Sequence, residues 1–204
     1  RYSSNNGEEF KGGDMIYEDI NHDGVINDLD IVQIGDANVG YFGLFRHNLN
    51  WKNWAMGISF YYNVDQDVIN GQRYQLENMN SESNQATSVM RRWRKQGDIT
   101  DMPRAERYCE RNYAASSRFV EDVSYLKLKE ISLTYDFGRQ IVQKLRLSKL
   151  SLSCTCENIF TWTKYKGLDP EIAPNKGRLI KVGIDEQSTP TNSFKLTFGL
   201  RASF

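Results

Sequence analysis

A short acidic segment near the N-terminus has the residue types and the spacing of a calcium-binding loop. In residues 19–30, oxygen-bearing side chains occupy the first, third, fifth, ninth and twelfth positions, and a glycine occupies the sixth. The seventh position needs only a backbone carbonyl, so any residue type suits it. The candidate ligands are Asp19, Asn21, Asp23, Val25, Asn27 and Asp30. Calcium takes about six to eight oxygen ligands, and this loop supplies about that number, so the sequence predicts a bound calcium ion.

Two features separate this loop from a helix–loop–helix calcium site. The twelfth position is Asp30 instead of glutamate, which shortens the reach of the carboxylate, and no helical pattern flanks the loop. We therefore expect a structural clip on a loop, with no catalytic role. The alternative is a turn rich in Asn, Asp and Gly that binds no metal.

The rest of the chain offers no catalytic arrangement. The only histidines, His22 and His47, lack the Ser, Cys or paired-His context of a catalytic or zinc site. No GxSxG, phosphate-binding or GxGxxG pattern occurs, and lone carboxylates such as Asp169 and Glu171 are typical of solvated loops. The sequence predicts that the chain is not an enzyme.

Composition and charge narrow the class of protein. Lys and Arg together number 26, as do Asp and Glu, so the formal net charge is zero and a nucleic-acid partner is not expected. No run of about 18 apolar residues predicts a transmembrane helix. A transmembrane barrel remains open, because its strands carry only about 10 residues of alternating hydrophobicity.

Five segments alternate between apolar and polar residues, as half-buried strands do. The clearest is 193–204, which has Phe194, Leu196, Phe198 and further apolar residues on one face and ends on Phe204. In one segment the alternation slips by one residue at Lys129-Glu130, which predicts a β-bulge. The predicted strands lie near 41–51, 54–63, 120–137, 149–160 and 193–204.

The connections and the aromatic residues favour an outer-membrane β-barrel. Short links (52–53 and 138–148) alternate with long ones (64–118 and 161–192), as periplasmic turns alternate with extracellular loops. Aromatic residues collect at both ends of the strands, as in the girdles at the two membrane interfaces. The sequence thus predicts an all-β fold in which residues 1–204 form five strands of a large antiparallel transmembrane barrel. Five strands cannot close such a barrel, so we expect further strands from sequence outside this chain.

This topology assigns sides of the membrane and candidate contacts. Residues 1–40 and the two long loops would be extracellular, and the C-terminus would be periplasmic. Aromatic side chains expected in the loops are candidates for stacking on a substrate. They are Tyr74, Trp93, Tyr108, Trp162 and Tyr165.

Several motifs together resemble the C-terminal part of the SusC/RagA family of TonB-linked outer-membrane transporters. The similarity runs through Gly13-Asp14 with 19–30, Arg92-Trp93, 117–135, 157–171 and the closing 199–204. Two departures are Glu157, where the family commonly has a small or amide residue, and Lys127, where it often has Arg.

The resemblance implies properties of a whole transporter from Bacteroidetes-type Gram-negative bacteria. It implies a barrel of about 22 strands with a plugged lumen, a TonB-contacting segment and a SusD-like surface lipoprotein as a lid. It implies TonB-dependent import of nutrients, mainly glycans and in some members peptides, across the outer membrane. The terminal Phe204 resembles the signal read by the barrel-assembly machinery, and the outward face would meet outer-membrane lipid.

Two other proteins would share parts of this pattern. A soluble, calcium-stabilised β-sandwich that binds carbohydrate would pack its apolar strand faces against each other. An outer-membrane porin or adhesin barrel would share the strands but would lack coupling to TonB.

Overall fold

A computed structural model describes residues 3–5, 7–80, 82–109, 111–172, 183–186 and 192–204. The chain divides into two compact units. The loop unit comprises Arg1–Asp36, Asp67–Glu121 and Gly177–Ser188, and the strand unit comprises Ala37–Gln66, Asp122–Lys176 and Thr189–Phe204.

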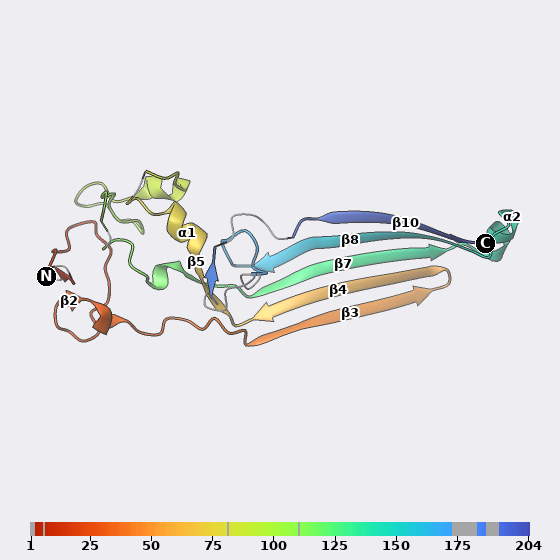
Figure 1. The fold of residues 1–204 in the computed structure, drawn as a ribbon, viewed down its shortest axis with the longest axis horizontal. Helices are drawn as coiled ribbons and strands as arrows, with labels where there is room; N and C mark the ends of the chain where they lie inside the picture. The colour runs from red at the N-terminus through yellow and green to blue at the C-terminus, as the bar shows by residue number, and fades with distance from the viewer. Residues whose placement is uncertain (1–2, 6, 81, 110, 173–182, 187–191) are drawn as a thin grey trace. The chain divides into compact units, whose positions relative to one another are not determined.

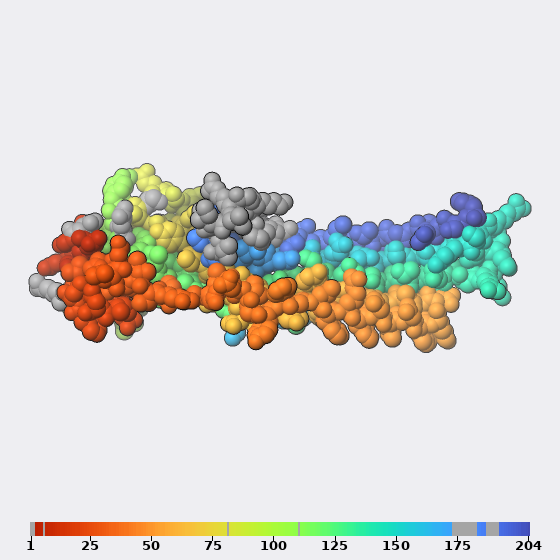
Figure 2. Space-filling model, turned by 60° about the horizontal axis from the view of Figure 1, so that its bottom comes forward, coloured from red at the N-terminus to blue at the C-terminus, as the bar shows by residue number. Residues whose placement is uncertain are grey.

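The strand unit is a five-stranded antiparallel sheet in the order β10-β8-β7-β4-β3 (Figure 1). Its strands are β3 (Tyr41–Trp51), β4 (Trp54–Val64), β7 (Tyr125–Asp136), β8 (Lys149–Thr163) and β10 (Lys195–Ser203). In space-filling view the strands follow one another from orange β3 to blue β10 (Figure 2). The all-β, antiparallel fold class predicted from the alternating pattern is confirmed.

The predicted limits of two strands differ from the structure by three residues or more. The segment 120–137 contains two strands, β6 (Val120–Asp122) and β7, because the Val123 N–H leaves the ladder and donates to the Gln66 carbonyl at 2.9 Å. Strand β8 runs three residues further than predicted, because Thr161 and Thr163 continue the pairing with β7.

The turns at one end of the sheet are short. Lys52-Asn53 joins β3 to β4 with Lys52 at a φ of 52°, and the Asn53 side chain donates to the Asp136 carbonyl at 2.8 Å. The link between β7 and β8 contains the short helix α2 (Arg139–Lys144).

The predicted bulge is present, and it changes which side chains share a face. Ser59 of β4 pairs with Glu130 and the next residue, Phe60, pairs with Leu128, so Lys129 is the extra residue of β7. Strand β8 is irregular at the same level, where Asn158 has a φ of 53°. The bulge lets Lys127 and Lys129 lie on the polar face together with Glu130.

The pattern of burial in the sheet is the reverse of that in a soluble domain. The buried side chains of the five strands are polar: Ser59, Asn63, Lys127 and Ser151. The opposite face exposes large apolar side chains. These include Trp54, Tyr62, Leu126, Leu133, Leu152, Phe160, Trp162, Phe198 and Leu200. A continuous apolar outer face is expected of strands that meet lipid, and a sandwich would have buried it.

The loop unit is built from short elements. Strands β1 (Ser3–Ser4) and β2 (Val25–Ile26) pair in parallel, and β5 (Asp67–Asn70) lies between β6 and β9 (Ile184–Asp185). Its helices are α1 (Gly71–Leu76) and the 3-10 turns η1 (Asp28–Asp30), η2 (Thr87–Arg91) and η3 (Ser117–Phe119). A small core contains Met79, Val89, Met102 and Tyr113. Among the described residues, no helix is long and apolar enough to cross a membrane.

Candidate functional site

A cluster of opposite charges lies on the polar face of β7, at the end of the sheet away from the short turns. Lys127 Nζ lies 3.2 Å from Asp169 Oδ1 and 2.7 Å from Glu171 Oε2. Lys129 Nζ lies 3.2 Å from the same oxygen of Glu171. We call these four residues the lysine–carboxylate cluster. It fastens the segment that follows β8, residues 164–172, to the polar face of β7.

The carboxylates of the cluster are themselves held in place. The Glu171 N–H donates to Asp169 Oδ1 at 3.0 Å. The Asn192 amide donates to Asp169 Oδ2 at 3.1 Å and to Glu171 Oε2 at 2.8 Å. The Lys127 side chain is only 3% exposed, so its ammonium depends on these oxygens for the interactions that water would otherwise supply.

Both carboxyl groups of the cluster are ionised at neutral pH. Burial raises the pKa of Asp169, but the Glu171 N–H, Lys127 and Asn192 outweigh it and lower that pKa overall. Burial also raises the pKa of Glu171, and the two lysines outweigh it in the same way. Two ammonium groups therefore face two carboxylates, and the cluster carries no net charge.

Sequence reasoning missed this cluster, since Asp169 and Glu171 resemble solvated loop carboxylates. The available signal was a pair of lysines, Lys127 and Lys129, two residues apart within one predicted strand. Only the fold shows that their partners come from about forty residues further along the chain.

The predicted calcium loop adopts a compact turn. Asp19 Oδ2 accepts from Gly24 N at 2.9 Å, and Asn21 Oδ1 accepts from Asp23 N at 3.0 Å. Asp23 Oδ1 accepts from Val25 N at 2.7 Å. The carboxylate of Asp30 accepts hydrogen bonds from the backbone N–H groups of Asn27 and Ile20, so the end of the loop contacts its start. These hydrogen bonds lower the pKa of Asp30.

The donor set of this loop fits a hard cation, although its side chains do not converge on one point. Asp19 is 8% exposed, and its Oδ1 is a buried oxygen with no hydrogen-bond partner. Among the described residues, however, no three His, Cys, Asp or Glu side chains are grouped closely enough to hold a metal ion. The calcium site stays a prediction.

The aromatic candidates divide into buried and exposed residues. The Tyr74 hydroxyl donates to the Tyr113 carbonyl at 3.0 Å. Tyr165 is buried, and its ring lies where a Cβ on Gly167 would be. Trp162 lies within β8, on the apolar face beside Phe160, instead of in a loop. These three side chains are engaged in packing or turned to the apolar face.

The two remaining aromatic candidates lie in the loop unit. Trp93 packs against the backbone of Gly13, whose φ is +85°, and lines a hollow of about 370 Å³ together with Ile16 and Pro103. Tyr108 is 80% exposed, with the Arg107 guanidinium 5.1 Å from its ring centroid. Trp93 is half-buried and Tyr108 is exposed, and a stacking role for either ring stays a prediction.

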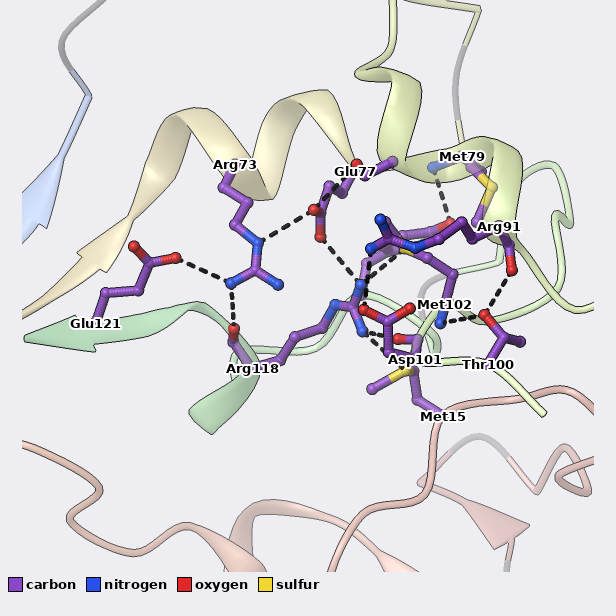
Figure 3. A network of polar contacts seen from close by, with 12 residues as sticks. Met15, Arg73, Glu77, Met79, Arg91, Thr100, Asp101, Met102, Arg118 and Glu121 are labelled. Carbon is purple, nitrogen blue, oxygen red and sulfur yellow. Dashed lines mark hydrogen bonds and ion pairs between the residues drawn. The ribbon is translucent and has the colours of Figure 1, made fainter. Parts of the chain in front are cut away.

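Ion pairs hold the loop unit in shape. Figure 3 shows Arg73 between Glu77 and Glu121, at 3.1 Å and 2.9 Å, and Arg118 reaching Glu77 at 3.0 Å. A second network surrounds Asp14, which Arg104 reaches at 2.6 Å and Arg111 at 3.1 Å. Because these charged side chains are largely buried and mutually satisfied, they fix the loops instead of offering reactive groups.

Comparison with known proteins finds similarity to receptors and to an importer. No family model matches it. Two TonB-dependent receptors of Formosa agariphila, P3 and P39, are each 29% identical to it, over 97% and 95% of the chain. The structure of the RagAB peptide importer in the open-open state matches 80% of the chain with a TM-score of 0.65 and 25% identity. The closed-closed state matches 82% with a TM-score of 0.67 and 24% identity.

The sheet with its apolar outer face has the fold of an outer-membrane β-barrel segment, and its sequence is similar to that of TonB-dependent receptors. It is a SusC/RagA-like sequence, as the motifs indicated, and the curated relatives that it matches are named as receptors. The chain spans about a fifth of the length of the curated relatives it matches.

Proposed function

We propose that this chain forms part of the barrel wall and the extracellular mouth of a TonB-dependent importer of nutrients. The reversed burial of the sheet carries the proposal, because a polar inner face and an apolar outer face suit a wall between lumen and lipid. Similarity to TonB-dependent receptors and to a peptide importer supports the coupling to TonB. In this orientation the short turns and Phe204 are periplasmic.

The proposed substrates are glycan oligosaccharides, with peptides as the alternative, and the proposed partner is a SusD-like surface lipoprotein that covers the mouth. Trp93 and Tyr108 would supply stacking surface at the mouth. The barrel-assembly machinery would recognise the strand that ends in Phe204, whose side chain is fully exposed at the end of β10.

Fractionation of the full-length protein tests the barrel, and uptake tests the coupling. We expect the protein in the outer membrane, with a gel mobility that shifts on boiling, and uptake of its nutrient that stops when TonB is deleted. Recovery without detergent and no shift on boiling would contradict the barrel. Uptake that continues without TonB would leave a porin or adhesin barrel as the better account.

We also propose that the 19–30 loop binds calcium as a structural clip. The unpartnered buried oxygen of Asp19 supports this second proposal. Titration calorimetry of the full-length protein with calcium chloride should show binding that the double variant Asp19→Asn/Asp23→Asn weakens at least about tenfold, because two charged ligands become neutral. Asp28→Asn, an exposed position between ligands, is the matched control and should bind as the parent does. Absence of binding at millimolar calcium would refute the proposal.

A further inference from the structure

A cavity of about 230 Å³ opens on the polar face of the strand unit, beside the lysine–carboxylate cluster. Strands β7 and β8 form one wall, and the segment that follows β8 forms another. The residues that line it are Lys127, Asn158, Thr161, Thr163, Gly167, Leu168, Asp169, Pro170 and Asn192. Neither the calcium loop nor the aromatic candidates of the loop unit contribute to it.

One buried side-chain oxygen in this cavity has no hydrogen-bond donor. Asn158 Oδ1 is buried and has no hydrogen-bond partner, whereas the Nδ2 of the same side chain donates to the Ser193 carbonyl at 3.0 Å. Asn158 sits at the irregular level of β8 with a φ of 53°, a conformation that Asn adopts more readily than most residues. Because a buried acceptor without a donor is costly, this oxygen calls for a donor from outside the chain.

The charges around the cavity indicate which kind of ligand could supply the missing hydrogen-bond donor. Lys127 is already paired with Asp169 and Glu171, and Lys129 balances the second carboxylate, so the cavity presents no net charge to a ligand. The other polar lining groups are the hydroxyls of Thr161 and Thr163, which can donate and accept. Leu168 and Pro170 add apolar surface. Uncharged groups that carry both hydroxyls and C–H surface match this lining.

We propose that this cavity is a subsite for one uncharged sugar unit of the transported solute, with a sugar hydroxyl donating to Asn158 Oδ1. The inference rests on the proposed function and names a place in the barrel wall where the glycan is held. The ion pairs of the cluster keep the 164–172 segment in place, so the wall of the subsite exists before the sugar arrives.

Binding of single sugars to the full-length transporter in detergent tests the subsite. The sugar probes are glucose, galactose, mannose and fructose, and the peptide probe is a capped, uncharged tetraglycine. Saturation-transfer NMR measures the binding of each probe. We expect at least one sugar to bind. Asn158→Gly, which adopts the same φ and removes the acceptor oxygen, and Thr161→Val, which keeps the shape and removes a hydroxyl, should each weaken binding of that sugar about threefold to tenfold through the loss of a hydrogen-bond partner.

The matched control is Thr155→Val, a threonine on the same face of β8 that does not line the cavity. It should bind the sugar as the parent does, and all variants should keep the mobility shift on boiling. The inference is overturned if no sugar binds, if the two variants bind as tightly as the control, or if only the peptide probe responds to them. In the first two outcomes the partner of Asn158 is water or a donor from the rest of the transporter.

Failure of this inference is distinct from failure of the proposed function. Uptake that needs TonB, together with sugar binding indifferent to Asn158, would retain the importer and remove the subsite. Sugar binding that depends on Asn158, together with uptake independent of TonB, would retain the subsite and remove the coupling.

Discussion

At the scale of single residues, the most consequential side chain of the strand unit is Lys127. It is a cation on the polar face of a strand, and it is almost entirely shielded from solvent. A buried ammonium is tolerated only when its partners replace the lost hydration, and here Asp169 and Glu171 do so. The role of these carboxylates is therefore to pair with a buried lysine and to fasten a loop.

Lys127→Met should release the 164–172 segment. Removing one partner of a buried pair costs about 3–5 kcal/mol, because the other partner is left charged and unpaired. Hydrogen exchange of the full-length protein should show faster exchange across 164–172, with the rest of the sheet unchanged. Lys129→Met is the control, since that side chain is 28% exposed and should have a smaller effect. Equal protection in the parent and the Lys127 variant would mean that the cluster does not fasten the segment.

At the scale of elements, the bulge in β7 positions the cluster. Because Lys129 is an extra residue in β7, the apolar side chains before and after the bulge stay on the outer face of the sheet. The same bulge brings the side chains of Lys127 and Lys129 to the polar face. The same level of β8 holds Asn158 at its unusual φ, so one irregularity of the sheet shapes both the cluster and the neighbouring cavity.

Acid should loosen the fastened segment. The pKa values of Asp169 and Glu171 are lowered by folding, so their contribution to stability is complete above their unfolded pKa values of about 4. It is lost as the pH falls below that and through the lowered values. Hydrogen exchange between pH 7 and pH 3, corrected for the intrinsic rate, should show protection of 164–172 that holds to about pH 4 and then falls. Protection that declines between pH 7 and pH 5 would contradict this assignment.

At the scale of the whole molecule, the exposed apolar face of the sheet needs a lipid environment. Phe198 is 70% exposed on that face, and its neighbour Thr197 points to the polar face. Replacing Phe198 with Lys should destabilise the folded full-length barrel in lipid vesicles by about 2–4 kcal/mol if the position lies near the middle of the bilayer.

Thr197→Lys is the matched control, because the same charge then faces the lumen. Urea unfolding in vesicles, followed by the mobility shift on boiling, measures both variants. A smaller effect of Phe198→Lys than of Thr197→Lys would show that the faces of β10 are assigned the wrong way round.

The sequence by itself determined where the five long strands lie and which face of each strand is apolar. Period-two alternation is local, so it can be read without knowing what a strand pairs with, and the slip at Lys129-Glu130 marked the bulge. The same reading misplaced the end of β8 and the break between β6 and β7, because those limits depend on pairing partners. The motifs also indicated the family.

Only the tertiary structure decided which polar residues act together. Asp169 and Glu171 resemble solvated loop residues until the segment after β8 folds back on Lys127 and Lys129. Three aromatic residues were expected in loops but are held by packing or by strand pairing: Tyr74, Trp162 and Tyr165. Side chains distant in sequence meet through the path of the backbone between them, and neither local periodicity nor composition encodes that path.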